Sequence, residues 1–328
     1  MAAAYSTMAP QIYIHIGLHK TATRFLQRSV FAHLDRKAFN HNPQPLTDLL
    51  YRHLRNPDDQ SLKQRFDDAC ASVLQQDTRK LLISLPDISG DMYNSHDNAW
   101  QNLELIKTKF AQARILYFVR DQADWLLSAY RQSIQKGVFG PLEVFLNFYD
   151  GDFKPKTAQR RGGMRNVDAR GLKLWAIYQA YAEAYGADNV YLIRYEDFRA
   201  NRDAVVRCLA EWLQVPSIPV HRDGKTRHNR SFSALAIRLF CGGRTPPKSP
   251  PKAADRLSAW QKTYSPVRLL RNLRRVFIRK VFDRIIYKDW DLLARNGMRE
   301  TLERHYQDEN KLIAQAARQC AVSQQEKT

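Results

Sequence analysis

The chain has 328 residues, of which 44% are hydrophobic, and this suits one large globular domain or two smaller ones. Its 52 Lys and Arg exceed its 33 Asp and Glu and give a net charge of +19, which predicts a polyanionic partner without specifying it. No apolar run approaches the roughly 18 residues of a membrane span, and the N-terminus lacks the pattern of a secretory signal. The four Cys are scattered singly, so we expect a cytoplasmic protein without a disulfide framework.

Short apolar segments alternate with segments of helical periodicity. The predicted strands cover residues 11–18, 80–85, 114–119 and 190–194. The predicted helices cover residues 25–34, 100–110 and 172–182. This alternation favours a three-layer α/β/α fold with a central parallel sheet, whose ligands gather at the carboxyl ends of the strands.

The composition changes after residue 240. A segment rich in Gly, Pro, Lys and Ser, CGGRTPPKSPPKAA, follows and favours a linker or an extended crossing segment. We therefore predict an α/β core over residues 1–240, a linker over residues 241–260 and a basic helical C-terminal extension over residues 261–328.

Within that extension, residues 264–290 predict a basic amphipathic helix. They carry eight Lys or Arg against two Asp, and one helical stripe is apolar: Leu270, Leu273, Phe277 and Val281. This stripe can pack on the core and leave the charges in water. Alternatively, the helix can lie on an anionic membrane surface, at the inner face of the membrane.

The segment GLHKTAT, residues 17–23, connects the first predicted strand to the first predicted helix. A turn glycine, a lysine and hydroxyl residues at a helix start suit phosphate binding, because unpaired N–H groups and the helix dipole attract anions there. Lys20 adds a mobile charge, and Thr21 and Thr23 add hydroxyl groups that can also cap the helix. The loop is not a Walker A motif, because only two residues separate Gly17 from Lys20.

A second candidate anion site follows the strand at residues 114–119. Arg120 ends that strand, and Ser128 lies eight residues later in the next helix. Guanidinium and hydroxyl donors in this arrangement can converge on one anion. The alternative is a surface ion pair of Arg120 with Asp121 or Asp124.

Together these segments resemble the sulfotransferases that use 3′-phosphoadenylyl sulfate (PAPS), particularly the bacterial and carbohydrate-type members. The segment KTATR at residues 20–24 is similar to the family's 5′-phosphosulfate loop, and Arg120 with Ser128 is similar in spacing to its 3′-phosphate site. The segment YLIRYEDF is similar to a strand end of the family, and RHNRS at residues 227–231 resembles its basic loop over the donor. The resemblance covers residues 11–240 and implies a P-loop-like fold.

The resemblance also implies which residues bind the donor. They are Lys20, Thr21, Ala22, Thr23, Arg24, Arg120, Ser128, Tyr195, Arg227 and Asn229. Two of them depart from the family pattern, because Ala22 replaces a glycine and Arg24 replaces a threonine. The methyl group of Ala22 restricts the backbone where the loop would wrap closely around phosphate, although helical dihedral angles there would tolerate it. Arg24 would either help to neutralise the donor or point outward.

The implied reaction moves a sulfuryl group from PAPS to an acceptor by in-line displacement and releases adenosine 3′,5′-bisphosphate (PAP). Lys20 would offset the charge that develops on the leaving phosphate, so no metal is expected. Asp87, after the second predicted strand, is the first candidate for the base that takes the acceptor's proton, unless it only shapes a turn. His19 is the second candidate, and His15 is predicted to be a packed core residue.

A carbohydrate or glycolipid is the predicted acceptor. The basic loop at residues 150–171 could guide an acidic glycan or could simply be solvated. A kinase is the first alternative, although the sequence lacks a complete Walker A loop and a clear magnesium ligand. A non-catalytic basic module that binds nucleic acid or membrane is the second. It would explain the charge but not the paired phosphate motifs, so we expect no nucleic-acid partner.

Overall fold

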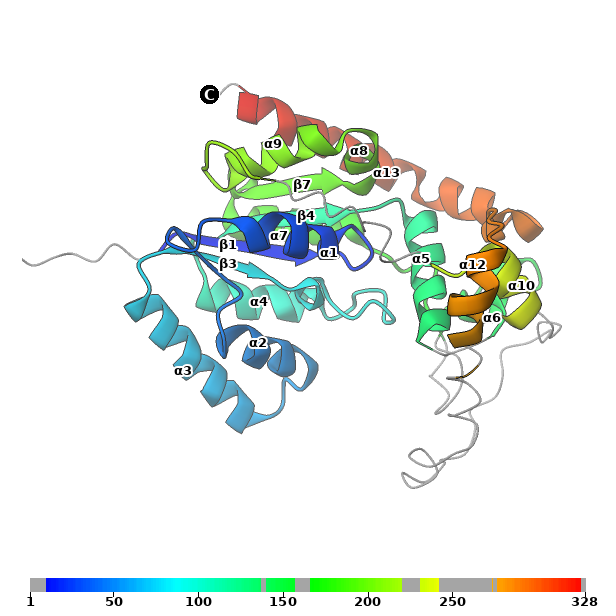
Figure 1. The fold of residues 1–328 in the computed structure, drawn as a ribbon, viewed down its shortest axis with the longest axis horizontal. Helices are drawn as coiled ribbons and strands as arrows, with labels where there is room; N and C mark the ends of the chain where they lie inside the picture. Colours follow the sequence, from blue (N-terminus) through cyan, green and yellow to red (C-terminus); the bar gives the residue numbers. More distant parts are fainter. Residues whose placement is uncertain are drawn as a thin grey trace, which may run out of the picture.

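The computed structural model describes residues 10–136, 140–156, 166–219, 231–241, 273 and 276–325. Five parallel strands form its central sheet (Figure 1). In spatial order they are β2 (Phe39–His41), β3 (Lys80–Ser84), β1 (Ile12–Gly17), β4 (Arg114–Val119) and β7 (Val190–Arg194). The four predicted strands are confirmed. The edge strand β2 was not predicted, because its sequence FNH has only one apolar residue.

Alternate side chains of each central strand enter different cores, as the two-residue period of a strand requires. In β1, Ile14 belongs to the core on one face of the sheet, and Tyr13 belongs to the core on the other. Because both faces are covered, the strands are almost continuously apolar. This burial confirms the predicted three-layer α/β/α architecture.

Helices cover both faces of the sheet (Figure 1). On one face lie α2 (Leu46–Arg55), α3 (Gln60–Gln76), α4 (Ala99–Lys109), α5 (Gln122–Gln135), α7 (Leu174–Tyr185) and α13 (Met298–Gln325). On the other lie α1 (Thr23–Phe25), the π-helical turn η1 (Leu26–Val30), α8 (Tyr195–Ala200) and α9 (Arg202–Trp212). The shorter elements are α6 (Leu142–Phe145), α10 (Ala234–Cys241), α12 (Asp283–Ile285), the turns η2 (Phe31–His33), η3 (Pro86–Ser89), η4 (Ala187–Asn189), η6 (Ile278–Phe282) and η7 (Leu292–Gly297), and a hairpin of β5 (Phe148–Tyr149) and β6 (Asp152–Phe153).

The predicted helices are present with local differences. The segment 25–34 is not one regular helix but passes from α1 through η1 into η2. In α4, Leu103 and Ile106 are buried as the periodicity predicts, whereas Trp100 is exposed. No helix in the described ranges is both long and apolar enough to cross a membrane.

The C-terminal part differs more from the sequence-based expectation. Most of the predicted linker and Leu270 lie outside the described residues. Leu273, Phe277 and Val281 are 57%, 47% and 43% exposed, so the interpretation that this stripe packs on the core is wrong for these three residues. The core contacts of this segment come from Ile278 and Phe282 instead.

Candidate functional site

The loop after β1 lies against the loop after β4. The two strands are neighbours in the sheet, so their carboxyl ends reach the same edge. The guanidinium of Arg120 donates to the carbonyl oxygen of Lys20 at 3.5 Å, and the indole of Trp125 donates to that of His19 at 2.8 Å. The structure thus brings the two predicted anion-binding segments together.

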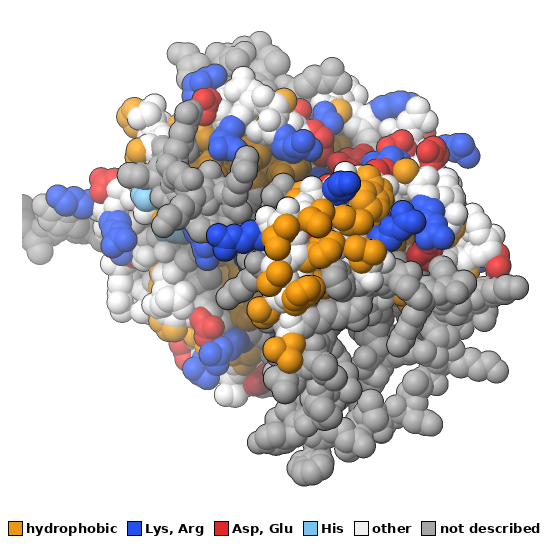
Figure 2. Space-filling model, turned by 45° about the vertical axis from the view of Figure 1, so that its right-hand side comes forward, with side chains coloured by type: hydrophobic (Ala, Val, Ile, Leu, Met, Phe, Trp, Pro, Cys, Tyr) orange, Lys and Arg blue, Asp and Glu red, His pale blue; other side chains and the backbone are white. Residues whose placement is uncertain are grey.

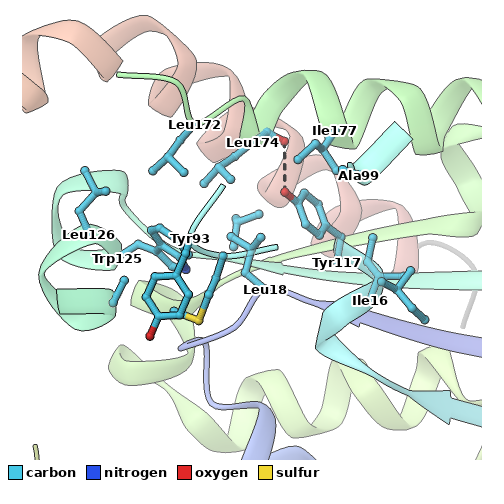
Figure 3. Close-up of a cluster of buried hydrophobic side chains, with 14 of the residues drawn as sticks. Ile16, Leu18, Tyr93, Ala99, Tyr117, Trp125, Leu126, Leu172, Leu174 and Ile177 are labelled. Atoms are coloured by element: carbon cyan, nitrogen blue, oxygen red, sulfur yellow. Dashed lines mark hydrogen bonds between the residues drawn. The ribbon is translucent and has the colours of Figure 1, made fainter. Parts of the chain in front are cut away.

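A buried apolar cluster supports this junction. Leu18 from the first loop and Trp125 from α5 both point into it, with Ile16 and Leu126 nearby (Figure 3). The hydroxyl of Tyr117 donates to the Leu174 carbonyl oxygen at 3.4 Å within the same cluster. Because these side chains are fully buried, the loop ends rest on a close-packed base.

The loop at residues 17–23 has an unusual backbone. Lys20 and Ala22 have φ angles of 68° and 63°, in the left-handed region that favours glycine. Ala22 therefore does not have the helical angles that would tolerate a methyl group, and its conformation explains why a glycine would suit this position.

The two threonines of this loop do not cap the helix. The hydroxyls of Thr21 and Thr23 both donate to the carbonyl oxygen of Leu18, at 2.6 and 3.1 Å. The residue before α1 is Ala22, which has no side chain for capping, so the prediction that a threonine caps α1 is wrong. Instead, the hydroxyls close the loop around one carbonyl group.

Several cations converge on Lys20. Burial, and to a smaller extent the charges of Arg24, Arg120 and Lys136, together lower the pKa of Lys20 to about 8. Arg24 is exposed yet contributes to this group. Lys136 follows α5 and was not predicted from the sequence. Mutual repulsion among these charges would be relieved by an anion.

Arg120 lies against an aromatic ring at the end of β4. Its guanidinium lies 4.7 Å from the ring centre of Tyr195, another predicted donor-binding residue. The side chain is 16% exposed, and its buried Nε finds no hydrogen-bond partner in the part of the chain that the structure describes. The predicted alternative, an ion pair with Asp124, is long at 3.8 Å. Ser128 lies in α5, one turn after Trp125, and is half-buried.

Glu196, the residue after Tyr195, supports the same loop. Its carboxylate accepts a hydrogen bond of 3.1 Å from the main-chain N–H of Asp121. The Tyr-Glu-Asp sequence thus places an aromatic ring beneath Arg120 and a carboxylate on the next residue. The sequence resemblance predicted a role for the ring of Tyr195 but none for Glu196.

The two candidate bases are neighbours in space: His19 lies in the loop after β1, and Asp87 follows β3. Asp87 is in η3, where one oxygen lies 3.5 Å from Nε2 of His19 and the other accepts from Arg55 at 2.9 Å. Burial acts to raise the pKa of Asp87, but the hydrogen bonds and charges of His19 and Arg55 outweigh it and lower the pKa. Gly17 allows the loop after β1 to lie close to Pro86, because a Cβ at position 17 would be only 3.1 Å from the Cα of Pro86.

Two other histidines near the site are buried. His15 accepts or donates a hydrogen bond of 2.8 Å with Ser84, and burial together with the charge of His41 lowers its pKa to about 3. The prediction that His15 is a packed core residue is confirmed. His96 has a pKa of about 3 for the same main reason, burial, with a further contribution from the charge of His19.

The model of the family described as "Sulfotransferase family" matches residues 10–219, which is more than half of the chain. The chain belongs to the sulfotransferase family. The residues that match the family model include the loops after β1 and β4, Asp87 and Tyr195. The matched region ends before α10 and α13.

Solved structures of sulfotransferases are similar at low identity. A sulfotransferase from Alicyclobacillus acidocaldarius is 16% identical over 66% of this chain and 89% of its own, with a TM-score of 0.44. A mouse sulfotransferase complexed with PAP is 14% identical over 92% of this chain and 89% of its own, with a TM-score of 0.36. A sulfotransferase domain from the curacin biosynthetic pathway is 16% identical over 64% and 75%, with a TM-score of 0.34. No curated protein matches the chain significantly.

Some predicted features of this sulfotransferase fall outside the described residues. Arg227 and Asn229 are among them. Within the basic loop at residues 150–171, Lys154 and Arg170 lie 3.4 and 2.6 Å from Asp152, so these two cations share one carboxylate. The described residues contain no group of three or more His, Cys, Asp or Glu arranged to hold a metal ion.

Proposed function

We propose that this sulfotransferase uses PAPS as its donor, transfers the sulfuryl group to a hydroxyl or amine of the acceptor, and releases PAP. The observation that carries the proposal is the contact between the Lys20 loop and Arg120, which joins two cationic loops at one sheet edge. PAPS carries a phosphosulfate at its 5′ end and a phosphate at its 3′ end. Lys20 would bind the first and Arg120 the second.

Lys20 has the environment that transfer requires. Its half-buried ammonium is surrounded by other cations, so it gains most when negative charge develops nearby. In sulfuryl transfer this charge develops on the bridging oxygen of the leaving phosphate. Removing such a contact lowers the rate by about 10² to 10³.

The acceptor's proton would pass to the His19 and Asp87 pair. The carboxylate lies between an imidazole and a guanidinium, an arrangement that orients both partners. His19 and Arg55 lower the pKa of this carboxylate despite its burial, so Asp87 is ionised at neutral pH.

A transfer assay with radiolabelled PAPS tests the proposal. Glycans, lipids and phenols are offered as acceptors, and label is expected in a carbohydrate or glycolipid. The variant Lys20→Ala should lose transfer while keeping its fold, whereas Lys63→Ala, at an exposed position of α3, should behave like the wild type. Wild-type turnover by Lys20→Ala would refute the role of Lys20.

Thermal stabilisation separates the alternative functions. PAP should raise the melting temperature, whereas ATP with magnesium should not. Stabilisation by ATP and magnesium alone would indicate a kinase instead. A salt-dependent gel shift with nucleic acid, without any sulfuryl transfer, would indicate a non-catalytic basic module.

We further propose that this protein binds the inner face of an anionic membrane, where a glycolipid acceptor would be accessible. Figure 2 shows apolar side chains gathered on the face that carries α10 and α12, with Lys and Arg beside them. The exposed apolar residues of α10 and of residues 273–290 are Leu239, Leu273, Val276, Phe277, Val281, Ile285, Ile286 and Trp290. Ile285 is the most open of them, at 75% exposure. Such a patch marks an interaction surface.

The charges around this patch favour an anionic bilayer. Asp283 is buried and accepts from the Ser233 hydroxyl at 2.6 Å, and Asp289 pairs with Arg131 at 2.6 Å. Both acidic residues of the segment 264–290 therefore have partners within the protein, while Arg284 and Lys288 are exposed. Apolar insertion and electrostatic attraction together give stable peripheral binding.

Vesicle co-sedimentation tests this surface. The protein should pellet with vesicles that contain phosphatidylglycerol but not with pure phosphatidylcholine. The variant Phe277→Asp with Ile285→Asp should stay in solution, whereas Leu312→Asp, an exposed position on α13, should still pellet. If the wild type ignores vesicles but forms a dimer that the double variant disrupts, the patch is a protein interface instead.

A further inference from the structure

Asp124 lies between two arginines from distant parts of the chain. One of its oxygens is 2.9 Å from Nη2 of Arg299, and the other is 3.8 Å from Nη2 of Arg120. Arg120 precedes α5 and is only four residues before Asp124 in the sequence. The shorter contact nevertheless goes to Arg299, which is 175 residues away in the sequence.

Arg299 is held firmly in this place. Asp291 binds its guanidinium through two contacts, one at 3.2 Å and a shorter one to Nε, and Glu303 lies at 3.2 Å from Nη1. The hydrogen bond to Asp291 raises the pKa of Arg299, burial opposes this, and the hydrogen bond to Asp124 adds to the rise. Arg299 is therefore a fixed positive charge.

Two further residues of α13 bind the residues at the start of α5. Asn310 donates to the carboxylate of Asp121 at 3.2 Å, and Glu309 accepts from the side chain of Gln122 at 3.1 Å. Glu309 also accepts from the main-chain N–H of Trp175 at 2.7 Å. The start of α5 is thus held at two places along α13, by Arg299 and by the adjacent residues Glu309 and Asn310. The helix α13 lies along this side of the sheet (Figure 1).

We propose that Arg299 is a positioning residue for the donor site, which keeps the carboxylate of Asp124 from closing on Arg120. This inference rests on the proposed function, in which Arg120 reads the 3′-phosphate. With Asp124 held by the hydrogen bond from Arg299, the guanidinium of Arg120 keeps donor groups for phosphate, including an Nε without a partner among the described residues. Without Arg299, Asp124 would compete with the phosphate for Arg120.

The test is a double-mutant cycle read by nucleotide binding. Arg299→Gln should weaken PAP binding by about tenfold, the effect of losing about one charge-assisted hydrogen bond, while binding of AMP, which lacks the 3′-phosphate, changes less than about twofold. Adding Asp124→Asn to that variant should restore PAP binding, because the competing charge is gone. Arg304→Gln, at an exposed position of the same helix, is the matched control.

The outcomes separate this inference from the proposed function. If the wild type does not prefer PAP over AMP, or if Arg120→Ala weakens both equally, the proposed donor site is wrong. If the wild type prefers PAP and Arg120→Ala removes that preference, but Arg299→Gln binds PAP normally, only the role of Arg299 is wrong. Equal losses for PAP and AMP in Arg299→Gln, without rescue by Asp124→Asn, would show that Arg299 is merely structural.

Discussion

The indole N–H of Trp125 donates a 2.8 Å hydrogen bond to the main-chain carbonyl of His19, which joins α5 to the loop after β1. The ring itself is fully buried and lies beside Leu18 (Figure 3). Lys20, the residue that we propose to stabilise the transition state, follows His19 directly. The position of the loop therefore depends on a side chain more than 100 residues away.

Replacing Trp125 by Phe should loosen the loop. The variant keeps most of the apolar contact but leaves the His19 carbonyl without this donor, which should lower the free energy of unfolding by about 1 to 3 kcal/mol. Urea unfolding measures this loss, and calorimetric titration should show weaker PAP binding. Trp100→Phe is the control, because Trp100 is exposed on α4. Equal stability of both variants would show that this hydrogen bond is unimportant.

Replacing Ala22 by Gly should stabilise the protein. Ala22 has a φ of 63°, and this left-handed conformation costs a residue with a Cβ about 1 to 2 kcal/mol. Glycine removes that cost but adds unfolded-state entropy, so we expect a net gain of about 0.5 to 1 kcal/mol in urea unfolding. The control Ala204→Gly, inside α9, should instead lose about 1 kcal/mol. A loss at both positions would contradict the strained backbone.

The binding of PAP should weaken above pH 8. The pKa of Lys20 is lowered to about 8 in the free protein, and a bound phosphate would raise it. Binding is therefore complete below the pKa of the free protein and declines as pH rises from there through the pKa of the complex. Titration calorimetry across this range measures the decline. Lys20→Met should bind more weakly but show no such step, and a step retained in Lys20→Met would assign it to another group.

Replacing Asp87 by Asn should slow turnover more than it weakens donor binding. Loss of the carboxylate beside His19 should lower kcat by about 10² or more, with PAP affinity nearly unchanged. A parallel loss of PAP affinity would instead place Asp87 in the donor site. Steady-state kinetics and calorimetry provide the two measurements.

The same variant has a pH-dependent effect on stability. Because the folded-state pKa of Asp87 is lowered, its stabilising contribution is present above the unfolded pKa of about 3.9 and is lost as pH falls through the folded value. Urea unfolding should therefore separate Asp87→Asn from the wild type at neutral pH but not in strong acid. Asp58→Asn, at an exposed position, should match the wild type throughout.

The sequence alone predicted four of the five strands of the sheet. Strands buried on both faces are continuous apolar runs, and β1 and β4 are of this kind. The edge strand β2 contains an asparagine and a histidine and has no apolar run, so its pairing with β3 could not be predicted from its composition. The conformation of Ala22 was also unpredictable, because alanine ordinarily favours right-handed helical angles.

The candidate site, like the fold, was predictable from the sequence only in part. Lys20 and Arg120 were recognisable because each follows a strand end within a local motif, and parallel strands bring such ends to one edge. Tyr195 was recognisable only through the family resemblance. The partners of these residues were not recognisable. Arg299 meets Asp124, and Arg55 meets Asp87, through packing of helices that are distant in the sequence.

The sequence by itself determined the layered α/β fold, the sulfotransferase resemblance and the loops that carry the cations, because local periodicity and short spacings encode them. The tertiary structure decided which of these cations are neutralised and which remain available. Arg299 occupies Asp124 and leaves Arg120 above the ring of Tyr195. Charge balance at a site depends on distances between side chains, and only the packed fold sets those distances.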